Sequence, residues 1–210
     1  MTEIDWTAVF EAVAAELRRH HDAGLQRLLT EDVVRFATVR ALVDAGVDPA
    51  DLRAEWAAPV LHGGHVDLVI GDPTTTAVEF KFPREPVAKN AAWPQTLGEI
   101  AKDYYRVAVL PADVQTRLCV LVSTARLRRY LRSVADRCGV DMLAPRVHLA
   151  PERVLRLPQT ALRVLGDWAR TVEVTAHMLP IAEIDSDLWL QPYRVDPAAA
   201  RHESRCPDGS

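Results

Sequence analysis

Two runs decide the fold: Gly-His-Val-Asp-Leu-Val-Ile at 64–70 and Ala-Val-Glu-Phe-Lys-Phe at 77–82. Apolar residues alternate with other residues in both runs, which is typical of β-strands. The residues between them, Gly-Asp-Pro-Thr-Thr-Thr at 71–76, have turn chemistry. We therefore expect an antiparallel hairpin.

Three charged residues stand out in this hairpin. Glu79 and Lys81 are two residues apart, so in a strand their side chains point to the same face. Asp67 is out of phase with the apolar residues of the first strand. If the register places Asp67 opposite Glu79 or Lys81, two carboxylates and one ammonium converge on one face. A shift of one residue would send Asp67 to the other face.

Such a group has a clear chemical use. Two adjacent carboxylates suit a hard cation such as Mg²⁺ or Mn²⁺, and a nearby lysine can stabilise charge on a phosphate or orient an attacking water. The alternative is a solvated sheet face with a Glu–Lys pair, which Glu-x-Lys alone would favour. The added aspartate shifts the balance towards a metal site. Without metal, the two carboxylates should repel, and the pKa of one should rise.

This arrangement resembles the signature of the PD-(D/E)XK nuclease superfamily, an Asp on one strand followed by (Asp/Glu)-x-Lys on the next. The match is Asp67, then Glu79, Phe80 and Lys81, with Val66 where the family often has proline. The resemblance implies that Asp67, Glu79 and the backbone carbonyl of Phe80 hold Mg²⁺ or Mn²⁺. It implies that Lys81 is catalytic.

The resemblance also extends to two more distant residues. Glu31 matches, by location only, a glutamate on the helix before the sheet that often faces the metal. Its alternative role is that of an acidic residue favoured at a helix N-terminus. Gln95 lies where some branches of the family place a catalytic glutamine on the following helix. Its alternative is a solvated face shared with Glu99 and Lys102.

The predicted order of elements also resembles that family. Asp5 caps a first helix that ends near Gly24, and Thr30 caps a second that ends at Gly46. The first strand lies within 52–61 and precedes the hairpin. A helix from Pro94, a strand at 117–123 and a helix at 124–137 follow. The second helix is expected to bury a stripe made of Val33, Phe36, Ala37 and Val43.

We therefore predict an α/β fold with a restriction-endonuclease-like αβββαβ core, in which helices flank a mixed sheet. Residues 1–195 form a single domain, with the core at about 25–137 and a C-terminal extension at 145–195. The extension contains a helix at 158–171 and strands at 172–184 and 188–195, which either extend the sheet or form a separate hairpin. Residues 196–210 are predicted to be a disordered tail.

Composition and short sequence patterns limit the class of protein and its expected location. Apolar residues make up 49% and charged residues 26% of the chain, as in ordinary globular proteins, and no run is long enough for a membrane helix. The polar N-terminus is unlike a signal peptide, and the three cysteines lack a Cys-x-x-Cys spacing. Both features favour a reducing, cytoplasmic location. The sequence contains no Gly-rich phosphate loop, Gly-x-Ser-x-Gly or His-Glu-x-x-His.

The expected function is metal-dependent hydrolysis of phosphodiester bonds in nucleic acid, with DNA as the expected substrate. The net charge of −4 requires a local basic patch, and the arginines of helix 124–137 could supply it. Their alternative role is a solvated basic face. A catalytically idle scaffold that binds nucleic acid or protein is the competing function. A homodimer or a partner protein could supply specificity.

Overall fold

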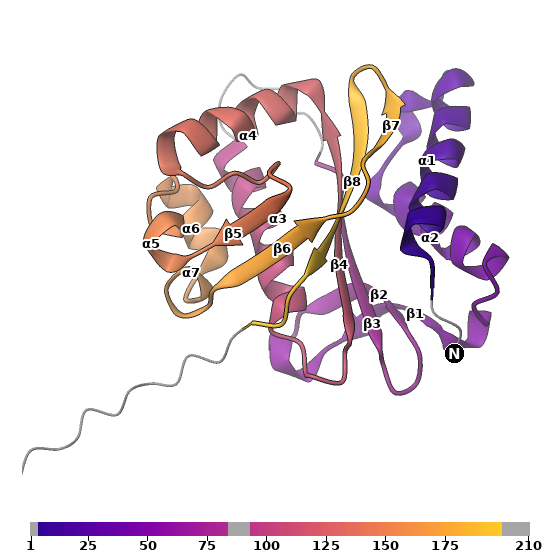
Figure 1. Ribbon diagram of the computed structural model, residues 1–210, viewed down its shortest axis with the longest axis horizontal. Coiled ribbons are helices and arrows are strands. Elements are labelled where there is room, and N and C mark those ends of the chain that lie inside the picture. Colours follow the sequence, from indigo (N-terminus) through magenta and orange to yellow (C-terminus); the bar gives the residue numbers. More distant parts are fainter. Residues whose placement is uncertain (1–3, 84–92, 199–210) are drawn as a thin grey trace, which may run out of the picture.

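The computed structural model describes residues 4–83 and 93–198, and within them the fold is α/β, with an eight-stranded mixed sheet flanked by helices (Figure 1). The helices are α1 (Trp6–Asp22), α2 (Glu31–Asp44), α3 (Trp93–Ala108), α4 (Ala125–Cys138), α5 (Pro151–Val154), α6 (Gln159–Leu165) and α7 (Trp168–Thr171). The strands are β1 (Leu52–Ala57), β2 (His65–Ile70), β3 (Thr76–Lys81), β4 (Thr116–Thr124), β5 (Arg146–Leu149), β6 (Val174–Met178), β7 (Ala182–Asp185) and β8 (Leu188–Val195).

The strands follow the order β1-β2-β3-β4-β8-β6-β5, and β7 pairs with β8 beside this path. The predicted antiparallel hairpin of β2 and β3 is confirmed, and β1 adds a third antiparallel strand beside β2. β3 and β4 run parallel, because α3 crosses over between them. Their C-terminal ends therefore lie at the same edge of the sheet.

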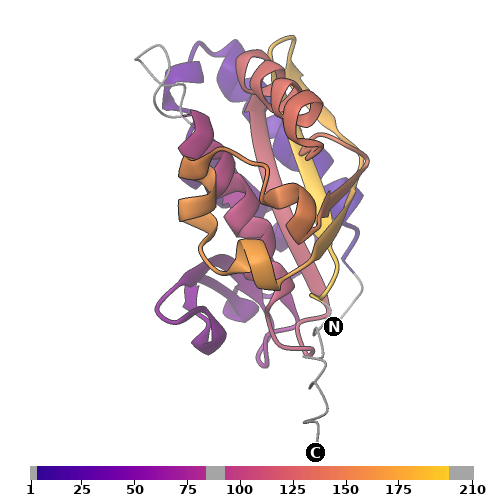
Figure 2. The same ribbon diagram turned by 90° about the vertical axis from the view of Figure 1, so that its left-hand side faces the viewer.

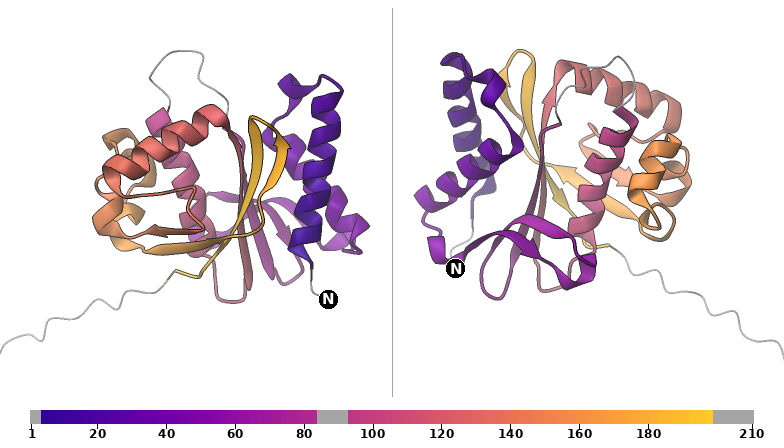
Figure 3. Two further views of the ribbon diagram at one scale, coloured as in Figure 1. Left: turned by 45° about the horizontal axis from the view of Figure 1, so that its top comes forward. Right: turned by 180° about the vertical axis from the view of Figure 1, so that it is seen from behind.

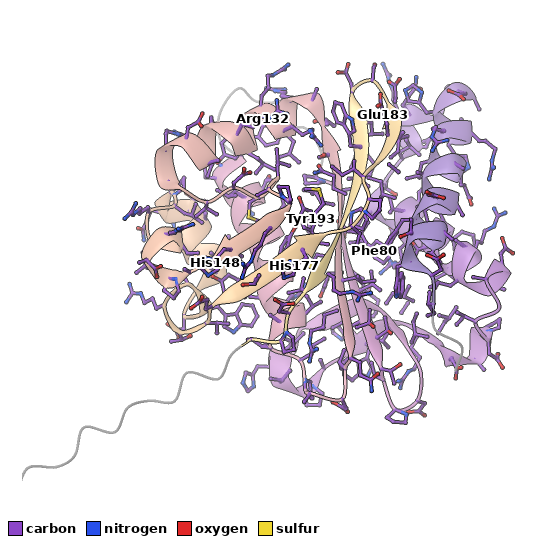
Figure 4. The ribbon with its side chains drawn as sticks, viewed as in Figure 1. Phe80, Arg132, His148, His177, Glu183 and Tyr193 are labelled. Atoms are coloured by element: carbon purple, nitrogen blue, oxygen red, sulfur yellow. The ribbon has the colours of Figure 1, made fainter. Side chains whose placement is uncertain are left out.

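Two hydrophobic cores lie on opposite faces of this sheet. One is packed between the sheet and helices α1 and α2, and the other between the sheet and helices α3 to α7. Phe80 belongs to the first core and Tyr193 to the second (Figure 4). Figure 2 views the molecule from the α3–α7 side. Because Glu79 and Lys81 alternate with Phe80, they face the second helical layer.

The predicted starts of α1 and α2 are confirmed. The Asp5 carboxylate accepts hydrogen bonds from the backbone amides of Thr7 and Ala8, and the Thr30 hydroxyl accepts one from Val33. The predicted buried stripe of α2 is wrong at two positions, since Phe36 is 64% exposed and Val43 is 38% exposed. Apolar residues occur on several sides of this helix, so periodicity could not choose its buried face. The helix instead buries Val34, Ala37, Thr38, Ala41 and Leu42.

The C-terminal extension needs three corrections. The predicted helix at 158–171 breaks at Gly166, whose φ of 57° and ψ of −136° suit glycine alone, and becomes α6 and α7. The predicted strand at 172–184 divides into β6 and β7. Strand β5 was not predicted. β8 pairs with β4, so the extension enlarges the main sheet instead of forming a separate hairpin.

Two further boundaries can be compared with prediction. The predicted strand within 52–61 ends as β1 at Ala57, because Pro59 begins a short 3₁₀ turn. Of the predicted disordered tail, residues 199–210 lie outside the described part of the chain.

Gly98 offers a test of the contact between α3 and α6. A Cβ at this position would lie 2.8 Å from the Val164 Cβ and 2.9 Å from the Ala161 Cα. We expect Gly98→Ala to destabilise the protein by about 1–2 kcal/mol. Overpacking costs about 1–3 kcal/mol, and the better helix propensity of alanine returns at most about 1 kcal/mol. Thermal unfolding measures the effect, with Lys102→Ala on the same helix as control. An unchanged or higher melting temperature would contradict the close packing.

Candidate active site

The hairpin register brings Asp67 next to Glu79. Leu68 pairs with Val78, so the same antiparallel register continued by one residue places Asp67 opposite Glu79. Asp67 Oδ2 accepts a hydrogen bond of 2.7 Å from the backbone amide of Phe80. The N–H and C=O of one strand residue point to the same side, so the Phe80 carbonyl also faces β2. The predicted convergence on one face is confirmed.

Lys81 lies between two carboxylates from different helical layers. Its Nζ is 3.3 Å from Glu31 Oε2 at the start of α2 and 3.4 Å from Asp103 Oδ2 on α3. Glu31 Oε2 also accepts a hydrogen bond of 3.1 Å from the backbone amide of Phe82. Glu31, proposed from its location alone, therefore does reach the end of β3. Two helices on opposite faces of the sheet hold one ammonium group.

Sequence reasoning missed two members of this cluster, Asp103 and Arg106, which lie one turn apart on α3. Arg106 Nη1 is 3.5 Å from Glu79 Oε1 and 3.6 Å from Asp103 Oδ1. A signal was available, since Asp103 directly precedes Tyr104 on the apolar stripe of the helix. A charged residue beside such a stripe needs a buried partner. The partners are on β3: Lys81 contacts Asp103, and Glu79 contacts Arg106.

Gln95 is not brought into the cluster. Its side chain is exposed, and Nε2 donates a hydrogen bond of 2.9 Å to Glu99 Oε1 on the same helix. It lies two turns from Asp103, on a helix whose rotation is set by its apolar stripe. The catalytic role suggested for Gln95 stays a prediction that this geometry does not support, and the solvated-face alternative fits better.

Burial dominates the electrostatics of the cluster. Glu79 is only 2% exposed, and this burial, with the charges of Asp103 and Asp67, raises its pKa to about 10 against the opposing effect of Arg106. Burial also raises the pKa of Asp103 to about 7, against the pull of Lys81 and Arg106. Burial alone would lower the pKa of Lys81, but the charges of Asp103, Glu31 and Asp67 outweigh it and raise that pKa.

The cluster contains more negative than positive groups. Four carboxylates, Glu31, Asp67, Glu79 and Asp103, interact with Lys81 and Arg106, and Asp67 also interacts with Arg35. If all of these groups are ionised, the carboxylates outnumber the basic groups, since Arg35 is shared with Asp32 and Glu55, and two of the carboxylates, Glu79 and Asp103, are buried. Burying unpaired charge is costly, so such a cluster either takes up protons or binds a cation.

The available oxygen ligands suit a hard cation for which the protein supplies only part of the coordination shell. Glu79 Oε1 and Asp103 Oδ2 are buried and have no hydrogen-bond partner. Among the described residues, no three side chains of the His, Cys, Asp or Glu type form a ready metal site. The basic groups between the carboxylates account for this. Mg²⁺ in proteins commonly uses one or two carboxylates and completes its shell with water and substrate phosphate, so Asp67, Glu79 and a carbonyl fit it.

No family model, curated protein or solved structure matches this chain. The interpretation of the cluster therefore depends on its own geometry and charge. Within residues 4–83 and 93–198, no helix combines the length and the apolar character needed to cross a membrane.

The raised pKa of Glu79 predicts a pH dependence of stability in metal-free protein. In the unfolded chain Glu79 loses its proton near its ordinary pKa of 4.5, whereas in the folded protein it keeps the proton to about 10. The unfolded state therefore binds fewer protons between these values, and stability falls as pH rises. The loss is at most about 1.4 kcal/mol per pH unit.

We expect the melting temperature in EDTA to fall between pH 7 and 9, and Glu79→Gln to flatten this slope. The raised pKa of Asp103, about 7, also makes stability fall as pH rises, but mainly below pH 7. Glu99→Gln on the outer part of α3 is the matched control and should keep the wild-type slope. Parallel slopes for Glu79→Gln and wild type would show that Glu79 is not protonated in the folded protein.

Proposed function

We propose that this protein is a metal-dependent nuclease of the PD-(D/E)XK type, which hydrolyses phosphodiester bonds in nucleic acid, with DNA as the expected substrate. One observation carries the proposal: Asp67, Glu79 and Lys81 converge on one sheet face, in a cluster whose carboxylates outnumber its basic groups. A structural ion-pair network has no need for that excess. A divalent cation would balance it, and a phosphate substrate could then bind through that cation.

The order of elements supports the same proposal. From α2 onwards it is one helix, three antiparallel strands, one helix and one strand parallel to β3. This order agrees with the αβββαβ core of that superfamily. Asp67 lies on β2 and Glu79 and Lys81 lie on β3, which is consistent with the signature. Agreement of topology and motif is a stronger argument than a three-residue motif alone.

Each residue then has a chemical role. Asp67, Glu79 and the Phe80 carbonyl would hold Mg²⁺ or Mn²⁺. Such an ion, when bound, polarises the scissile phosphate and lowers the pKa of a bound water. Lys81 stabilises negative charge on the phosphate, and its position is set by Glu31.

Asp103 and Arg106 support this group from α3. Asp103 holds the Lys81 ammonium on the side opposite Glu31, and Arg106 contacts Glu79 and Asp103 together. Because these groups lie in a rigid helix packed on the sheet, the lysine is held without large side-chain freedom. Positioning of this kind can contribute substantially to catalysis.

A catalytically idle scaffold remains the second candidate, and one observation favours it. Both basic side chains already contact carboxylates of the cluster, and among the described residues no three-ligand metal group is preformed. In that case the cluster would be structural, and the protein would bind nucleic acid or a partner without cleaving. Metal binding separates the two candidates.

We expect Mn²⁺ or Mg²⁺ to raise the melting temperature of the wild-type protein. At one hundred times the dissociation constant a ligand stabilises by about 2.7 kcal/mol, and for a domain of this size each kcal/mol corresponds to about 2–4 °C. Glu79→Gln should lose the shift, because it removes a ligand without changing side-chain size. Glu99→Gln should keep it. Equal metal shifts in wild type and Glu79→Gln would place metal binding elsewhere.

Cleavage tests the catalytic roles directly. With Mg²⁺ or Mn²⁺ and an oligonucleotide or plasmid, Asp67→Asn and Lys81→Ala should each lower the rate by about 10²–10³-fold or more. Asp67→Asn removes the charge of a metal ligand, and Lys81→Ala removes a cation beside the phosphate. Asparagine can still accept the hydrogen bond of the Phe80 amide, so the hairpin should remain intact. Lys102→Ala is the control for charge on α3. Cleavage that survives either change would refute these roles, provided circular dichroism shows folded protein.

A further inference from the structure

A pocket of about 460 Å³ lies beyond the C-terminal ends of β3 and β4. Residues from the end of α1, the start of α4 and the β7–β8 turn line it. These three elements come together at one end of the molecule (Figure 3, left). Its volume is within the range of about 300–1,000 Å³ that is usual for small-ligand sites. No residue of the charge cluster lines it, so it is a separate feature.

The pocket begins where the candidate active site ends. Phe82, which lines it, directly follows Lys81, and its backbone amide binds the same Glu31 oxygen that contacts the lysine. In the parallel register Lys81 pairs with Leu121 of β4. Thr124, also in the lining, is three residues further along β4, a rise of about 10 Å. A group bound in the pocket could therefore belong to the same substrate molecule as the group that reacts beside Lys81.

The side of the pocket formed by α4 is suited to a phosphate. Arg126 and Arg129 line it, one turn apart on this helix. The Arg126 guanidinium lies 5.7 Å from the centre of the Trp93 ring, so it is held in place by a cation–π contact. Arginine binds phosphate oxygens with a planar pair of N–H groups. Arg129 is exposed and reaches the pocket from the solvent side.

The remaining walls are suited to the rest of a nucleotide. Leu29, Phe82 and Leu188 supply apolar surface on which a base can stack. Asp185 also lines the pocket and contacts His21 Nε2 at 3.2 Å. A carboxylate there can accept hydrogen bonds from base amino groups or sugar hydroxyls. The lining thus combines basic, apolar and acidic side chains; the other acidic residue is Asp187, whose backbone carbonyl accepts a hydrogen bond from Ala125 at the start of α4.

We propose that this pocket binds one unpaired nucleotide of the substrate strand, next to the scissile phosphate. The inference rests on the proposed nuclease function and adds that the substrate is single-stranded, or unpaired at the cleavage point. A base in a duplex is paired and stacked, and it could enter such a pocket only by leaving the stack at a cost of a few kcal/mol. The arginines hold the phosphate, and Phe82 packs against the base.

The test measures binding without turnover. Fluorescence anisotropy in EDTA compares a labelled single-stranded oligonucleotide with the matching blunt duplex. We expect tighter binding of the single strand, and about a tenfold loss of affinity in Arg129→Ala, with a salt slope smaller by about one. Arg137→Ala is the matched control, an exposed arginine on the same helix but outside the pocket lining. It should change the affinity less than twofold.

Equal losses in the two arginine variants would overturn the inference in favour of a diffuse basic surface. Duplex binding as tight as single-strand binding would also overturn it. The nuclease proposal is tested separately, by the metal-induced shift in melting temperature and by cleavage. Single-strand binding that depends on Arg129, in a protein that neither binds metal nor cleaves, would support the pocket and refute the nuclease.

Discussion

The burial of Glu79 beneath α3 is the constraint on which the rest of this structure depends. A carboxylate that is almost fully excluded from water must be protonated, paired or bound to a cation. Arg106 approaches it at 3.5 Å, but Glu79 Oε1 still has no hydrogen bond. The incomplete pairing is what makes the cluster a candidate site instead of a structural ion pair. Glu79 lies on β3, an inner strand of the sheet, which is paired with β2 on one side and with β4 on the other.

The parallel pair β3 and β4 explains why site and pocket lie together. Both strands end at the same edge of the sheet, and α4 begins directly after β4. The first turn of α2 reaches the same edge from the opposite face and delivers Glu31 to Lys81. A charged group at the end of β3 is therefore reached from both helical layers. Ligands commonly bind at such carboxyl ends of parallel strands.

Local patterns predicted a large part of the fold. The caps Asp5 and Thr30, the hairpin and the helix from Pro94 are decided by residues close together in the chain, and the structure contains all of them. Long-range packing decided the parts that were missed. α2 has apolar residues on several sides, and its contacts with α1 and β3 select which of them are buried. The division of the C-terminal helix required the unusual backbone of Gly166.

By itself the sequence determined that Glu79 and Lys81 share one face, because side chains alternate along a strand. The hairpin register, which the structure supplied, decided that Asp67 joins them. The tertiary structure alone decided which helical residues join them. The crossing of α3 over the sheet brings Asp103 and Arg106 to the strands and leaves Gln95 in solvent. The rotation of a helix about its axis depends on everything packed against it. No window of the chain contains that information.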